Sequence, residues 1–162
     1  MTTRQFFNDV LPRTKLGAGR AKNVRTLLKR LGLISSGKME PVEVAWFILS
    51  MCMVTKRGFS DMQSVIKTHA DFFMEEQARG NANSLNTLAA ILTDKGLADE
   101  IAVLFIERNT LIMSAIRTNG ENRLVSNVSA FPAPDRPIFM AISGDDIRLI
   151  YNMIHHFETS LN

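Results

Sequence analysis

The run VAWFILSMCMV, residues 44–54, is the longest apolar stretch of the chain. It is well short of the roughly 20 apolar residues that cross a bilayer, and Glu43 and Lys56 lie at its two ends. Glu40 and Pro41 come before it, and proline is best tolerated in the first turn of a helix. We therefore expect a buried helix over residues 41–55.

The composition around this run is that of a folded globular protein. Hydrophobic residues make up 46% of the 162 residues, which is normal for a chain with a core. Cys52 is the single cysteine, so no disulfide framework is expected. It lies inside the apolar run, and we therefore expect a buried, structural thiol. Asp9 and Pro12 stand where a secretory signal would have its apolar region. We expect a cytoplasmic protein that does not enter the membrane.

Helical periodicity extends from the central run in both directions as far as about residue 97. On the N-terminal side, a capping box predicts a helix over residues 3–11, and the leucine spacing predicts another over residues 20–31. On the C-terminal side, two further helices are expected over residues 60–80 and 84–96. With the central run this gives about five helices. The proposed caps are Thr2 with Gln5, Ser60 with Gln63, and Ser84.

Beyond residue 97 the pattern changes from helices to strands. Three short runs rich in branched residues, IAVLFIE (101–107), TLIMSAIR (110–117) and RLVSNVSAF (123–131), predict an antiparallel meander. The pair Asn119-Gly120 is a strong hairpin signal between the second and third runs. IFMAI (138–142) predicts a fourth strand, and Ser143 with Asp146 caps a last helix to about residue 160.

The sequence therefore predicts an α+β fold in two parts. We expect residues 1–97 to form a helical region with a basic head, residues 1–56. Residues 98–162 form the sheet and the C-terminal helix, which we expect to dimerise or bind a partner.

Charge is distributed unevenly along the chain. The first 40 residues hold nine cationic and two acidic residues, a net charge of +7. The whole chain has a net charge of +3, so the other 122 residues carry −4. A basic head on a mildly acidic body is the asymmetry expected when one part of a chain meets a polyanion.

The helix predicted over residues 20–31 has two distinct faces. Val24, Leu27, Leu28 and Leu31 lie on one side. Spacings of three and four place Lys22, Arg25 and Lys29 together on the other, with Asn23, Thr26 and Arg30 on the flanks. Lysine and arginine contact phosphates or guanine edges, and asparagine can pair with adenine. The alternative is a surface helix whose charges are only solvated.

The segment VRTLLKRLGLI, residues 24–34, followed by a turn and an apolar helix, resembles a known group of proteins. Residues 3–56 are similar to small phage and prophage helix-turn-helix proteins of the repressor and small-terminase kind. This resemblance implies a DNA-binding head with residues 20–30 as the recognition helix. The candidate DNA-binding residues are Arg20, Lys22, Asn23, Arg25, Thr26, Lys29, Arg30 and Lys38.

The sequence contains no recognisable catalytic constellation. His69 lies on an apolar helix face, and the adjacent His155 and His156 point about 100° apart on a helix, so they do not chelate one metal from one face. There is no phosphate-binding loop and no dinucleotide fingerprint. We expect no enzyme activity, no metal and no cofactor.

The leading hypothesis is a non-enzymatic protein that binds double-stranded DNA as a homodimer, of the phage or prophage regulator or DNA-packaging type. Two surfaces are candidates for the dimer contact. One is the apolar stripe of the last helix, although its spacing favours packing on the adjacent sheet, and the other is the open sheet. The alternative function is a protein-binding module, such as a phage-encoded inhibitor or adaptor, that acts through the basic face.

Overall fold

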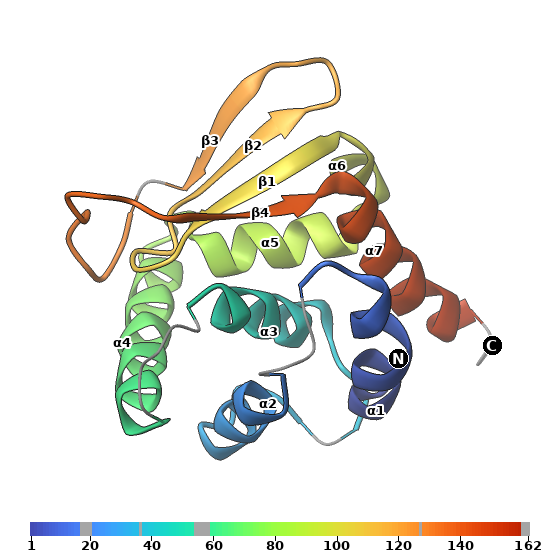
Figure 1. The fold of residues 1–162 in the computed structure, drawn as a ribbon, viewed down its shortest axis with the longest axis horizontal. Coiled ribbons are helices and arrows are strands. Elements are labelled where there is room, and N and C mark those ends of the chain that lie inside the picture. The colour runs from blue at the N-terminus through green and yellow to red at the C-terminus, as the bar shows by residue number, and fades with distance from the viewer. Residues whose placement is uncertain (17–20, 36, 54–58, 127, 160–162) are drawn as a thin grey trace.

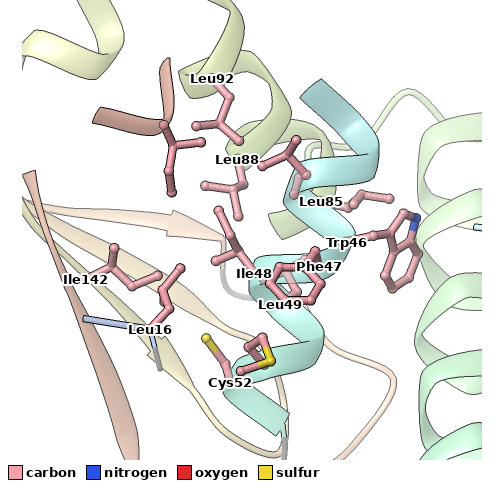
Figure 2. Close-up of a cluster of buried hydrophobic side chains, with 14 of the residues drawn as sticks. Leu16, Trp46, Phe47, Ile48, Leu49, Cys52, Leu85, Leu88, Leu92 and Ile142 are labelled. Atoms are coloured by element: carbon pink, nitrogen blue, oxygen red, sulfur yellow. The ribbon is translucent and has the colours of Figure 1, made fainter. Parts of the chain in front are cut away.

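Helix α3 (Pro41–Met53) lies at the centre of the fold, which is known from a computed structural model that describes residues 1–16, 21–35, 37–53, 59–126 and 128–159. Every residue of α3 from Val44 to Met53 is buried. Figure 2 shows its side chains packed against Leu85, Leu88 and Leu92 on one side, while Trp46 points toward another helix. The predicted buried helix is confirmed, because a helix that is apolar all round needs neighbours on every side.

The chain enters this core through an irregular helical segment. α1 (Thr3–Gln5) continues as a π-helical turn, η1 (Phe6–Val10), and a 3-10 turn, η2 (Leu11–Arg13), which contains Pro12. The predicted capping box is present: the Gln5 amide donates to Thr2 Oγ1 at 3.2 Å, and the Thr2 amide donates to Gln5 Oε1 at 2.8 Å. Helix α2 (Ala21–Arg30) follows, on the far side of α3 from the sheet (Figure 1).

Three helices are described between α3 and the first strand. α4 is Phe59–Ala78, α5 is Ser84–Thr93 and α6 is Lys95–Asp99. Trp46 of α3 packs against Phe73 of α4, with ring centroids 5.7 Å apart. Residues 54–58, which connect α3 to α4, lie outside the described residues.

Two details of the helix predicted over residues 84–96 are wrong. The cap is Asn83, whose Oδ1 accepts the Asn86 amide at 2.9 Å, because the Ser84 hydroxyl donates instead to the Leu111 carbonyl at 2.6 Å. The helix also divides at Asp94, whose extended backbone ends α5 and whose carboxylate accepts the Leu97 amide at 3.2 Å. One predicted helix is therefore two, α5 and α6.

The four predicted strands are present as one antiparallel sheet, but the third ends at Ser126, and residues 128–131 of its predicted run are not strand. They are β1 (Ile101–Glu107), β2 (Met113–Arg117), β3 (Asn122–Ser126) and β4 (Phe139–Ser143), in the order β3-β2-β1-β4. On the inner face, Leu104 lies opposite Ala115 on one side and Ile142 on the other. Helix α5 runs along this face, and among the described residues no helix covers the opposite face (Figure 1).

The predicted hairpin between β2 and β3 also forms. The Gly120 amide donates to the Arg117 carbonyl at 2.9 Å, and the Arg117 amide donates to the Glu121 carbonyl at 2.9 Å. Gly120 has a φ of 86°, a left-handed conformation that glycine adopts without steric cost. The loop is therefore residues 118–120, with the glycine at the return into β3.

The C-terminal helix α7 (Gly144–Thr159) closes the core. The Asp146 amide donates to Ser143 Oγ at 3.2 Å, as predicted for the cap. Ile147, Ile150 and Ile154 of its apolar stripe are buried within the chain, so the described part of the stripe packs internally, which was the alternative to a dimer contact.

Both halves of the chain contribute to the same hydrophobic core. Phe6 and Phe47 from the first half are buried in one cluster with Leu104 and Ile150 from the second. The Asp146 carboxylate also accepts the Lys15 amide at 3.0 Å, which joins α7 to the segment that leads into α2. The boundary predicted between residues 97 and 98 falls inside α6.

Candidate nucleic-acid interface

Helix α2 is amphipathic, as its spacing predicts. Ala21, Val24, Leu27 and Leu28 are buried, and Leu28 has no exposed surface. The candidate residues Lys22, Asn23, Thr26 and Arg30 are exposed, while Arg25 and Lys29 are half-buried. The structure therefore brings six of the eight candidate residues together on one short helix.

The centre of the exposed side differs from the sequence prediction. At about 100° per residue, the direction opposite the buried side chains falls between Lys22 and Thr26, with Lys29 and Arg30 next to them. We call these four residues, with Asn23 at one edge, the α2 face. Arg25 lies at the opposite edge, beside the buried Leu28, and is half-buried.

The Arg25 side chain makes an aromatic contact. Its guanidinium carbon lies 5.1 Å from the centroid of the Phe7 ring, a cation–π geometry. Phe7 in turn packs edge to face against Phe6 at 5.5 Å and Phe47 at 4.8 Å. Arg25 therefore links α2 to the helical segment before it and, through Phe7, to α3.

We expect Arg25→Ala to lower the free energy of unfolding by about 0.5–2 kcal/mol, because the substitution removes the cation–π contact and the packing of the stem. Urea unfolding measures the change, and Lys22→Ala, on the exposed side of the same helix, is the matched control. Equal stability of the two variants would show that the contact with Phe7 contributes nothing.

The lysines of the α2 face are not compensated locally. In the part of the chain that the structure describes, neither Lys22 nor Lys29 forms an ion pair. Two exposed lysines on other helices are paired: Lys67 lies 3.2 Å from Asp71, and Lys95 lies 2.6 Å from Asp99. The positive potential at α2 is thus available to an external anion.

Lys38 lies on a different segment from the other candidates. Lys38 pairs with Thr2 in an isolated β-bridge, and the Lys38 Nζ lies 3.9 Å from Glu40 Oε1. The segment is held by Glu43, whose carboxylate accepts the Ser35 amide at 2.6 Å and the Glu40 amide at 2.7 Å. The structure does not place Lys38 on α2, and Arg20 lies outside the described residues.

Glu43 supports this segment structurally, a role that was not predicted from the sequence. A glutamate at the third position of a helix, reaching back to the amide of the cap residue, is one half of a capping box. Glu43 lies three residues after Glu40, with Pro41 between them, and this spacing indicates such a cap in the sequence.

The connection into α2 is longer than in the motif that the sequence resembles. Residues 14–20 separate η2 from α2, whereas a helix-turn-helix has a turn of about three or four residues. The interface is therefore defined by the exposed side of α2 and by the contacts that anchor the helix.

Two ionisable side chains away from α2, Cys52 and Glu107, are buried in the fold. Burial raises the pKa of the Cys52 thiol to about 12, and its sulfur lies 3.4 Å from Met140 Sδ. Burial also raises the pKa of Glu107, but hydrogen bonds, led by those from the Thr110 hydroxyl and amide at 2.7 Å, outweigh it and lower the pKa overall. Glu107 thereby holds the turn between β1 and β2.

No group of three or more histidine, cysteine or acidic residues within the described ranges could hold a metal ion. No helix in these ranges has the length and apolar character needed to span a bilayer.

Comparison of the chain with protein-family models, curated proteins and solved structures found no match.

Proposed function

We propose that this protein binds double-stranded DNA, without catalysis, through the α2 face. The observation that carries the proposal is the pair Lys22 and Lys29, which have no acidic partner among the described residues and lie on a helix anchored by a buried apolar side. Phosphate contacts from such residues supply most of the affinity of a protein for duplex DNA.

The dimensions of α2 suit the major groove. An α-helix with its side chains is about 10–12 Å across, and the major groove is about 12 Å wide, so α2 can enter it. Lys22, Lys29 and Arg30 would contact phosphates or guanine edges, and the exposed Asn23 amide can pair with adenine.

The Thr26 hydroxyl is already engaged within α2. It donates to the Lys22 carbonyl at 3.0 Å. Toward a base edge, the Thr26 hydroxyl can therefore only accept a hydrogen bond, and the side chain can offer its methyl group. This favours an exocyclic amino group or a thymine methyl opposite Thr26.

We further propose that two copies act together, as in the phage or prophage regulators and DNA-packaging proteins that the sequence resembles. The outer sheet face, which includes the half-buried Val103, Phe105 and Ile116, is the remaining candidate for the contact. A pair of heads would double the phosphate contacts and fix the spacing of two half-sites. Light scattering on the free protein measures its molar mass, which should be that of two chains.

The alternative function is binding of an acidic protein through the same face, and salt dependence separates the two. Fluorescence anisotropy with a labelled duplex of random sequence is the assay. For DNA binding, the logarithm of the association constant should fall linearly with the logarithm of salt concentration, by about 0.9 for each phosphate contacted. Absence of duplex binding at low salt would favour the protein partner.

A further inference from the structure

A cavity of about 340 Å³ opens between the sheet and the α5–α6 segment. Its lining includes Ile91 and Leu97 from the helices, Ile101 and Ala115 from the sheet, and the side chains of Arg117 and Arg123. It lies on the sheet side of α3, whereas α2 lies on the other side (Figure 1). The volume is at the lower end of the range of about 300–1,000 Å³ that is typical of ligand sites.

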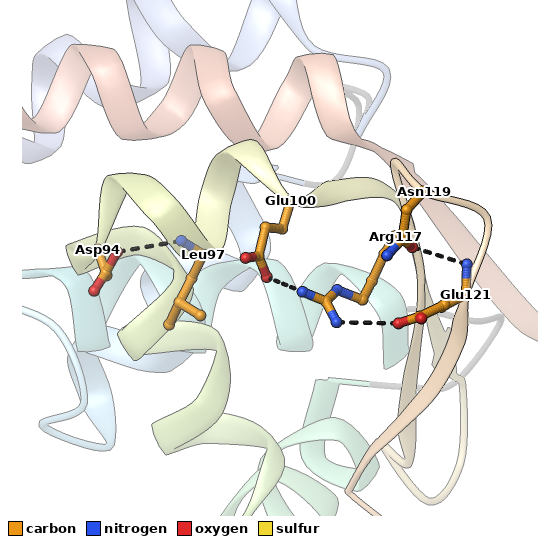
Figure 3. Close-up of polar contacts among 6 residues, drawn as sticks. All are labelled: Asp94, Leu97, Glu100, Arg117, Asn119 and Glu121. Atoms are coloured by element: carbon orange, nitrogen blue, oxygen red, sulfur yellow. Dashed lines mark hydrogen bonds and ion pairs between the residues drawn. The ribbon is translucent and has the colours of Figure 1, made fainter.

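The floor of the cavity is apolar. Ile91, Ile101 and Ala115 are buried, and Leu97 is 40% exposed at the rim. Leu97 is held in place by the cap of α6, where Asp94 Oδ1 accepts its amide at 3.2 Å (Figure 3). A floor of this kind favours a hydrocarbon group over a fully hydrated ion.

The two arginines at the cavity have different electrostatic surroundings. Arg117 donates to Glu100 at 2.7 Å and to Glu121 at 3.2 Å, so two carboxylates offset its charge and fix its position (Figure 3). Arg123, opposite Ala115 on β3, is exposed and has no acidic partner among the described residues.

We propose that this cavity binds a small amphipathic carboxylate, with its hydrocarbon chain on Ile91, Leu97 and Ile101 and its carboxylate on Arg123. A guanidinium group binds a carboxylate through two parallel hydrogen bonds. Glu100 and Glu121 would repel a dianion such as a phosphate monoester, so the site favours a single negative charge. The small volume favours a short chain.

Octanoate is the probe for this proposal, titrated into the full-length protein by calorimetry. We expect saturable binding that is weakened at least tenfold by Arg123→Gln. The matched control is Arg136→Gln, which removes the same charge from an exposed arginine that does not line the cavity, and should bind octanoate as the unaltered protein does.

Octanamide tests the role of the carboxylate, since it has the same chain without the charge. We expect it to bind at least tenfold more weakly than octanoate. The proposal is overturned if octanoate does not bind, if the amide binds equally well, or if the Arg123 and Arg136 variants have equal affinity for octanoate.

Discussion

Replacing Leu28 with alanine should lower the free energy of unfolding by about 2–5 kcal/mol. Leu28 has no exposed surface, and it lies on the side of α2 that packs into the core with Val24 and Leu27. Truncation removes apolar contacts and leaves a cavity that the surrounding side chains fill only in part. Denaturant unfolding followed by circular dichroism measures the loss.

Thr26→Ala is the matched control for Leu28→Ala, because it changes an exposed residue of the same helix. Its effect should stay within about 0.5 kcal/mol. If Leu28→Ala were as stable as Thr26→Ala, the assignment of buried and exposed sides of α2 would be reversed, and the α2 face with it.

The second large effect is expected for the double variant Lys22→Ala, Lys29→Ala. If both lysines contact phosphates, the slope of log affinity against log salt should decrease by about two units, and duplex binding at low salt should weaken for every sequence tested. Stability should change little, because neither lysine forms an ion pair in the described part of the chain.

Lys67→Ala, Lys95→Ala is the control for net charge. It removes the same two positive charges from exposed helix positions where each lysine is paired with an aspartate. The slope for this variant should equal that of the unaltered protein. Equal losses in the two double variants would mean that net charge governs binding, and that α2 is not the contact surface.

Local sequence patterns predicted the elements of the fold well. The apolar run 44–54, the leucine stripe of α2 and the alternation in the four strands each depend on burial of one side of a regular element. The caps at Thr2 and Ser143 were also predictable, because their hydrogen bonds join residues three apart.

The features that the sequence did not predict depend on partners distant in the chain. Ser84 was expected to cap a helix, but its hydroxyl bonds to Leu111, 27 residues away. Arg25 was expected to be exposed with Lys22 and Lys29, but it is half-buried and its guanidinium lies over the Phe7 ring. The cavity beside Arg123 arises where α5, α6 and the sheet meet, and no short window of sequence contains that arrangement.

The most direct measurement of the central proposal is the map of backbone amide chemical shifts as a duplex is added to the labelled protein. The proposal predicts that the largest changes at low salt occur at residues 22–30, while the cavity lining at Leu97 and Ala115 stays unchanged. Saturable binding with the amides of α2 unaffected, and with changes centred on the sheet or α7, would contradict it.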